Sequence, residues 1–361
     1  MIDPADEPLA RMAATTPTEY WNDSCAVGEL EYAVARGAVG ATSNPTIVGE
    51  VLRKELETWR PRILELYAAS PTATDVDITW GVAEEMAVRG AAVLRPVFDR
   101  ERGRKGRLSI QTDPTLHRDS ERMLAQGVRF AALAANIQVK FPATSAGLVA
   151  IEEATALGIS INATVSFTVP QALAVGAAVE RGLERRTAAG GDVTTMSPVC
   201  TIMIGRLDDW MKATCERDDI VLDPAALDWA GIAAFKQAAA LYRERGYRTR
   251  LLAAAYRNRL HWTELVGGDV SLTMPWAWQR RFNASGIAIE PRFDQPVPAA
   301  HLAALERIPD FGRAYRPDGM TSEEFDSYGA TVRTLRSFIA SYWDLVRAID
   351  DIVLPNPDLR R

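Results

Sequence analysis

A lysine stands within an apolar stretch of the sequence, in the run NIQVKFPAT that begins at Asn136. If this run forms a strand, its side chains alternate between two faces, and Lys140 falls on the face opposite the apolar residues. The apolar face suits a covering layer of helices, so we expect Lys140 to point into the interior. Burial disfavours the charged ammonium, and the neutral amine is the nucleophile that forms a Schiff base with a ketone or aldehyde. The pattern alone also allows a lysine that reaches solvent or pairs with a carboxylate.

The scarcity of lysine gives this position more weight. Only five of the 41 basic residues are lysine, so arginine is the usual surface cation of this chain, and a lysine within a strand needs a reason. The three histidines and the three cysteines are scattered without metal-ligand spacing. We therefore expect no metal site and no histidine-based catalytic triad.

Polar residues also fall near the ends of other predicted strands, on the faces that alternation assigns to the interior or, for Asp23, at the strand end. A single Thr or Asn in such a place is more often a core polar group, but several beside a lysine and an aspartate favour a site. They suit proton transfer around a carbinolamine and the binding of sugar hydroxyls. These residues are Asp23, Thr42, Asn44, Gln111, Asn162 and Thr164.

Two arginines, Arg206 in IGRLDDW and Arg257 in AAYRN, follow later predicted strands. A forked guanidinium at a strand end suits a phosphate group. Each one alone is equally well a surface arginine in an arginine-rich chain. Glycine-rich phosphate loops of the GxGxxG or GxxxxGK[ST] type are absent from the sequence.

Eight predicted strands alternate with helical segments. The fold built from them must bring the lysine, the polar residues and the two arginines together. Eight such units in one chain favour a closed (β/α)8 TIM barrel, in which groups at the carboxyl ends of the strands form the active site. The predicted strands are Glu19–Asp23, Val39–Asn44, Arg107–Asp113, Asn136–Phe141, Ile159–Val165, Met196–Ile204, Arg250–Tyr256 and Asp269–Met274.

Apolar periodicity predicts the helices between these strands. The run FDRERGRKGR at Phe98–Arg107 is expected to be a solvated loop. Residues from about 288 to 361 contain further helices and no strand, with a capping pattern at Thr321 and Glu324. We expect one barrel domain over residues 1–361, with this region as a helical C-terminal extension. The main predicted helices are Thr46–Tyr67, Asp119–Leu133, Ser145–Leu157, Val169–Arg185, Pro224–Glu244 and His261–Leu265.

The composition narrows the class of protein. The 361 residues are 47% apolar, with a formal net charge of −6, so a nucleic-acid binder with a basic surplus is not expected. No apolar run is long enough for a membrane span, and the N-terminus lacks the features of a signal peptide. We expect a cytoplasmic protein without a membrane partner, and the sequence leaves open whether it forms a homo-oligomer.

Five motifs in order resemble the transaldolase family, over a region from about Asp23 to Pro275. Each motif alone is moderately specific for the family, and the five together, in register, are strong evidence for the resemblance. They are GATSNPTIV (Gly40–Val48), IQVKFPAT (Ile137–Thr144), GISINATVSFTVPQA (Gly158–Ala172), IGRLDDW (Ile204–Trp210) and AAYRN (Ala254–Asn258).

The resemblance implies a (β/α)8 barrel that needs no cofactor and transfers a dihydroxyacetone unit between sugar phosphates. By position, it implies that Lys140 forms the Schiff base, that Asp23 exchanges protons with substrate hydroxyls, and that Thr164 positions a catalytic water. The remaining matches imply that Thr42, Asn44 and Asn162 hold the donor sugar, that Thr201 lies near the substrate, and that Arg206 and Arg257 bind phosphate.

The sequence also departs from the family pattern. The third strand usually carries a glutamate that moves protons through the water, and here the residue is Gln111, which can only orient that water. The related fructose 6-phosphate aldolases have glutamine there but rely on a tyrosine near the sixth strand, where this chain has Met203. The other departures are Thr201 and Ala255 in place of serines, and Trp276 and Trp278 in place of small residues.

The leading hypothesis is therefore a transaldolase that acts through Lys140, with Gln111 and Thr164 holding water. A second is a diverged homologue that works as an aldolase or on another ketose. A third is a catalytically weak homologue that binds sugar phosphates. The retained lysine argues against the third.

Overall fold

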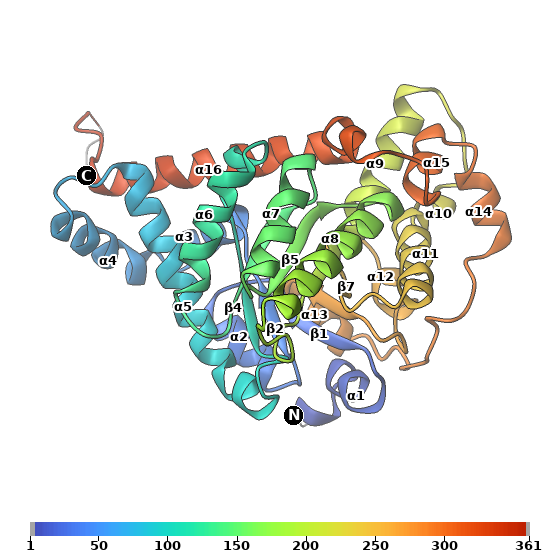
Figure 1. Ribbon diagram of the computed structural model, residues 1–361, viewed down its shortest axis with the longest axis horizontal. Coiled ribbons are helices and arrows are strands. Elements are labelled where there is room, and N and C mark those ends of the chain that lie inside the picture. The colour runs from blue at the N-terminus through green and yellow to red at the C-terminus, as the bar shows by residue number, and fades with distance from the viewer. Residues whose placement is uncertain (1–3, 359–361) are drawn as a thin grey trace.

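The structure is a computed structural model that describes residues 4–358, and its centre is a closed barrel of eight strands in chain order (Figure 1). Neighbouring strands are parallel throughout, and β8 pairs with β1 to close the ring. All eight predicted strands are confirmed, with ends that differ by a few residues. The strands are β1 (Glu19–Asn22), β2 (Gly40–Thr42), β3 (Arg107–Gln111), β4 (Ile137–Pro142), β5 (Ile161–Ser166), β6 (Val199–Ile202), β7 (Arg250–Ala253) and β8 (Ser271–Met274).

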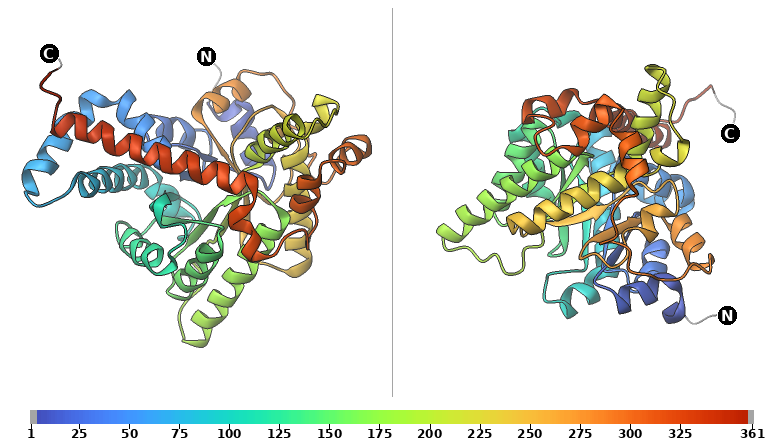
Figure 2. Two further views of the ribbon diagram at one scale, coloured as in Figure 1. Left: turned by 90° about the horizontal axis from the view of Figure 1, so that it is seen from above. Right: turned by 90° about the vertical axis from the view of Figure 1, so that its right-hand side faces the viewer.

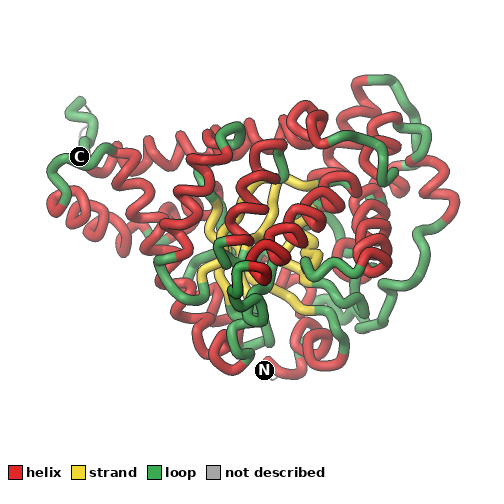
Figure 3. The backbone as a smooth tube through the Cα atoms, viewed as in Figure 1, coloured by secondary structure: helices red, strands yellow, loops and turns green. Residues whose placement is uncertain are grey.

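Helices form the outer layer around the barrel, which places the strands at the centre of the molecule (Figure 3). The apolar side chains of the strands pack against this layer, for example Phe141 of β4 in one core cluster with Phe130. α1 (Pro8–Thr15) precedes the first strand. The other helices up to the end of the barrel are α2 (Val27–Val34), α3 (Pro45–Lys54), α4 (Leu56–Ala69), α5 (Asp75–Arg100), α6 (Ser120–Ala131), α7 (Ser145–Ala156), α8 (Val169–Ala188), α9 (Ile204–Arg217), α10 (Pro224–Leu227), α11 (Ala230–Arg245), α12 (Leu260–Thr263) and α13 (Trp276–Asn283).

Two predicted helices are each divided in the structure. The segment predicted over Thr46–Tyr67 is α3 followed by α4, with a break at Glu55, whose backbone is not helical. The segment predicted over Pro224–Glu244 is α10 and α11, separated by Asp228 and Trp229. Apolar periodicity continues across both breaks, so it could not locate them.

The charged run Phe98–Arg107 is not a solvated loop along its whole length, which corrects the prediction. Its first residues belong to α5, a helix of 26 residues that opens with a capping box at Thr74 and Asp77. Its last residue, Arg107, begins β3 and is buried, and its guanidinium donates to the carbonyls of Gly103 and Thr195. These carbonyl partners, one from the preceding turn and one from a distant segment, explain how a charged residue can start a barrel strand.

The long C-terminal helix α16 (Gly329–Val353) lies across the face of the barrel where the strands end (Figure 2). It contacts α3, α9 and β5, as well as the short helix η2 (Pro114–Leu116) that follows β3. The predicted capping pattern at Thr321 is present but opens the 3-10 helix η3 (Ser322–Ser327) instead of α16. The other C-terminal helices are α14 (Ala299–Leu305) and α15 (Pro309–Tyr315).

The interior of the barrel contains a small apolar cluster of its own. It joins Trp21 of β1 with Val199 of β6, Leu252 of β7 and Ala254. The indole of Trp21 lies so close to Gly40 that a Cβ on Gly40 would come within 2.5 Å of the ring. Gly40 is therefore required for the indole to fill the barrel.

Within residues 4–358, no helix combines the length and apolar character needed to cross a membrane. The same part of the chain holds no group of three or more His, Cys, Asp or Glu side chains placed to bind a metal ion.

Candidate active site

Lys140 is buried inside the barrel, with 4% of its surface exposed. Its neighbours across the sheet are Gln111 of β3 and Asn162 of β5, which are its direct register partners. The other four lysines, Lys54, Lys105, Lys212 and Lys236, each form an ion pair with a carboxylate. Within the described residues Lys140 is thus the lysine without an ion pair, and amide residues flank it on both neighbouring strands.

The surroundings of Lys140 favour the neutral amine. Burial lowers the pKa of Lys140 to about 8, the nearby Asp23 carboxylate opposes this shift, and the Arg206 guanidinium adds to it. A pKa near 8 leaves an appreciable fraction of nucleophilic amine at neutral pH, whereas an ordinary lysine leaves almost none.

Asp23 lies at the end of β1, where its backbone N–H donates to the carbonyl of Met274 in β8. Its carboxylate accepts a hydrogen bond from Thr42 at 2.6 Å, and the Thr42 hydroxyl also contacts that of Thr273 at 2.7 Å. Burial raises the pKa of Asp23, while Lys140 and the Thr42 hydrogen bond work against that rise. A carboxyl group with a raised pKa beside an amine can exchange protons with a bound hydroxyl group.

Gln111 and Thr164 both lie within the barrel, next to the strand that carries Lys140. Gln111 is 4% exposed, and its carbonyl oxygen has no hydrogen-bond partner among residues 4–358. The Thr164 hydroxyl is buried and contacts the sulfur of Met203 at 3.9 Å. Both groups retain hydrogen-bonding capacity that a water or a substrate could use.

Asn162 and Thr201 form part of a polar network beside the strand that carries Lys140. The Thr201 hydroxyl donates to the Asn162 carbonyl oxygen at 2.7 Å, and the Asn162 amide donates to Ser109 at 3.1 Å. This network fixes the orientation of the Asn162 side chain. Asn44 is held differently, because it is the N-cap of α3 and its side-chain oxygen accepts from the backbone of Ile47 at 3.0 Å.

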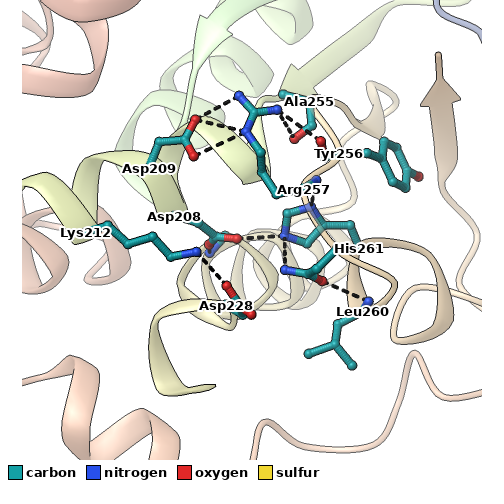
Figure 4. A network of polar contacts seen from close by, with 11 residues as sticks. Asp208, Asp209, Lys212, Asp228, Ala255, Tyr256, Arg257, Leu260 and His261 are labelled. Atoms are coloured by element: carbon teal, nitrogen blue, oxygen red, sulfur yellow. Dashed lines mark hydrogen bonds and ion pairs between the residues drawn. The ribbon is translucent and has the colours of Figure 1, made fainter. Parts of the chain in front are cut away.

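Arg257 is held by several partners beyond the end of β7 (Figure 4). Its guanidinium donates to the Asp209 carboxylate from two nitrogens, at 3.0 and 2.8 Å. The third nitrogen donates to the carbonyls of Ala255 and Tyr256. Arg257 is therefore well ordered, but a carboxylate already occupies one side of its fork.

Arg206 lies at the start of α9, on the same face of the barrel. Burial lowers its pKa, and the positive charge of Arg257 adds to that shift while Asp209 opposes it. Its guanidinium carbon lies 5.2 Å from the centre of the Phe338 ring of α16. The C-terminal helix thus contributes one wall beside the two predicted phosphate-binding arginines.

The chain is similar to known proteins over most of its length. A family model described as "Transaldolase/Fructose-6-phosphate aldolase" matches residues 20–311. This match covers more than half of the chain.

The chain belongs to this family.

Several curated relatives carry the name transaldolase. "Transaldolase 1" of Streptomyces avermitilis is 33% identical over 312 residues, which is 78% of this chain and 80% of the relative. "Transaldolase" of Parafrankia sp. is 29% identical over 349 residues, covering 86% of this chain and 91% of the relative. "Transaldolase" of Neisseria meningitidis is 29% identical over 276 residues, covering 72% of this chain and 78% of the relative. Together with the barrel fold, the family and these relatives support a transaldolase-like enzyme.

The two tryptophans that follow β8 have separate surroundings. Trp276 meets Tyr32 of α2 edge-on, with ring centres 6.3 Å apart, so its ring packs against the outer helix layer. Trp278 lies against Tyr256, with ring centres 6.4 Å apart. Trp278 therefore supports the segment that carries Arg257.

Sequence reasoning missed the residues that hold the Arg257 segment in place. Asp208 and His261 are both fully buried and form a hydrogen bond of 2.7 Å. The other ring nitrogen of His261, Nδ1, accepts from the backbone N–H of Arg257 at 3.1 Å, so the ring joins the Arg257 segment to Asp208 (Figure 4). The adjacent pair Asp208 and Asp209 in IGRLDDW was the sequence signal for these contacts. Neighbouring residues of an α-helix point in different directions, so the two carboxylates face different partners.

Proposed function

We propose that this transaldolase-like enzyme transfers a three-carbon dihydroxyacetone unit between sugar phosphates through a Schiff base on Lys140. The observation that carries the proposal is the environment of Lys140: buried, without an ion pair, and with its pKa lowered to about 8. Neutral amine attacks the ketone carbon of the donor, and loss of water from the carbinolamine gives the iminium ion.

In this proposal Asp23 acts as the general acid and base. Its carboxylate takes the proton of the substrate hydroxyl as the neighbouring carbon–carbon bond breaks, and returns it when the new bond forms. The Thr42 hydrogen bond at 2.6 Å keeps the carboxylate oriented toward the barrel interior. The electrons of the broken bond move into the iminium and give an enamine, which attacks the acceptor aldehyde.

Gln111 and Thr164 hold the water that takes part in carbinolamine formation and breakdown. The unpartnered oxygen of Gln111 supports this role, since an amide oxygen can accept from water but cannot take its proton. Thr42, Asn44, Asn162 and Thr201 bind the hydroxyl groups of the sugar. Arg206 and Arg257 bind its phosphate.

A second function, aldol cleavage without an acceptor sugar or with another ketose, is favoured by two observations. Gln111 cannot relay protons as a carboxylate would, and the carboxylate of Asp209 lies on Arg257, where a phosphate would bind. Either feature could change the preferred substrate or the rate of release.

A transfer assay separates these functions. The enzyme is supplied with fructose 6-phosphate, first with erythrose 4-phosphate and then with water alone, and the release of glyceraldehyde 3-phosphate is followed. We expect rapid release only with erythrose 4-phosphate and none from Lys140→Met. Equal release without the acceptor would assign the chain to the aldolases, and release by Lys140→Met would contradict the proposal.

A further inference from the structure

The hydroxyl of Tyr256 is buried and has no hydrogen-bond partner among residues 4–358. Tyr256 is only 3% exposed, and aromatic rings enclose it on several sides. Its ring centre lies 6.1 Å from that of His261 and 5.9 Å from that of Phe282, both in edge-on contacts. Because the ring is fixed in this way, the hydroxyl cannot move far to find another partner.

Other buried tyrosines of the chain satisfy their hydroxyl groups. Tyr20 donates to the carbonyl of Ala33 at 2.6 Å, and Tyr242 donates to the carbonyl of Ala172 at 2.5 Å. An unsatisfied buried hydroxyl costs stability, so each one in a native structure requires an explanation. Phenylalanine would fill the same space as Tyr256 without that cost.

The position of Tyr256 places it beside the candidate site. It follows β7, Asp23 follows β1, and β8 is the strand between them, paired with both. The two residues therefore flank the end of β8, where the Asp23 backbone is hydrogen-bonded to Met274. Figure 4 shows the Tyr256 hydroxyl directed away from Arg257 and Asp209.

The electrostatics agree with this position. Burial raises the pKa of the Tyr256 phenol well above its ordinary value, and the charge of Asp23 raises it further. The phenol therefore keeps its proton at neutral pH and can donate a hydrogen bond.

We propose that Tyr256 is a further catalytic residue, whose hydroxyl donates a hydrogen bond to the substrate oxygen that exchanges its proton with Asp23. This role rests on the proposed function of the site. During cleavage, the hydroxyl proton moves to the Asp23 carboxylate, the electrons of the carbon–carbon bond enter the iminium on Lys140, and the oxygen becomes an aldehyde carbonyl. Tyr256 stays protonated throughout, and in the reverse direction it polarises the acceptor aldehyde toward attack by the enamine.

The variant Tyr256→Phe tests this role, with Tyr242→Phe as the matched control. We expect Tyr256→Phe to lower kcat for transfer from fructose 6-phosphate to erythrose 4-phosphate on the order of 10²-fold. Its melting temperature should be unchanged or higher, because no protein hydrogen bond is lost. Tyr242→Phe should show the opposite pattern, a lower melting temperature with unchanged kcat.

Borohydride trapping with dihydroxyacetone keeps the two proposals separate, because it reports Schiff-base formation without cleavage. We expect Tyr256→Phe to give as much trapped adduct on Lys140 as the unmodified enzyme. An unchanged kcat with the adduct intact would overturn the role of Tyr256 alone. A destabilised or unfolded Tyr256→Phe would also overturn it, by showing that the hydroxyl has a structural partner. Absence of the adduct from the unmodified enzyme would overturn both proposals.

Discussion

Arg257 donates to the carboxylate of Asp209 at 2.8 Å, so the arginine proposed to bind phosphate already carries a negatively charged partner. The pair is partly exposed, with 37% of the Arg257 side chain and 40% of the Asp209 side chain accessible. A phosphate dianion that approaches Arg257 meets this carboxylate as well, and like charges at such distances repel.

Replacing Asp209 by Asn should therefore strengthen phosphate binding. We expect Asp209→Asn to lower the KM for fructose 6-phosphate severalfold, and to leave the KM for the unphosphorylated ketose dihydroxyacetone unchanged. Steady-state kinetics with both substrates measure this difference. Asp218→Asn is the control, because Asp218 pairs with Arg217 on the exposed end of the same helix. A higher KM for fructose 6-phosphate in Asp209→Asn would instead show that Asp209 is needed to hold Arg257 in place.

Restoring an acid at position 111 should speed the proton transfers. Gln111 is the register partner of Lys140, so a carboxylate there would face the same water. General acid–base catalysis contributes roughly 10²–10⁴-fold, and we expect Gln111→Glu to raise the single-turnover rate of adduct formation by about tenfold or more. Gln111→Leu, which cannot hold water, should lower it. An unchanged rate in Gln111→Glu would show that proton relay at this position is not limiting.

The rate of Schiff-base formation should depend on pH through Lys140. With a pKa of about 8, only about 1% of the amine is neutral at pH 6 and about half at pH 8. The rate of adduct formation should therefore rise with pH from 6 to 8 and level off above 9. Stopped-flow or quenched-flow measurements across this range report the midpoint. A midpoint near the ordinary lysine value would contradict the desolvation of Lys140.

Asp208 and His261 should stabilise the fold as well as the Arg257 segment. Both side chains are fully buried, and removal of one partner leaves the other without its hydrogen bond. We expect His261→Ala to lower the free energy of unfolding by about 3 kcal/mol or more, measured by urea denaturation. Asp218→Ala, at an exposed pair of the same region, should have no measurable effect. A small effect of His261→Ala would contradict this stabilising role of the buried pair.

The sequence predicted the barrel and the direction of Lys140 because both depend on local patterns. Strand alternation places Lys140 opposite Val139 and Phe141, and a strand with one apolar face can bury only that face against helices. The breaks at Glu55 and at Trp229 could not be predicted in this way, because apolar periodicity continues through them.

The contacts of the candidate site residues could not be predicted from the sequence. The ion pair of Arg257 with Asp209 joins residues 48 positions apart in the chain, and His261 meets Asp208 across 53 positions. Such pairings depend on how α9 packs against the segment that follows β7, which no local pattern contains. The place of α16 over the site is of the same kind, since it brings Phe338 to Arg206 from the far end of the chain.

The central claim is that Lys140 forms a covalent Schiff base with the donor sugar. The most direct test is incubation with fructose 6-phosphate, reduction with borohydride, and peptide mass spectrometry. We predict a three-carbon adduct on Lys140 and on no other lysine, with Lys236, the other partly buried lysine, unmodified in the same digest. The absence of an adduct on Lys140 with any ketose phosphate, or an equal adduct in Lys140→Met, would contradict the account.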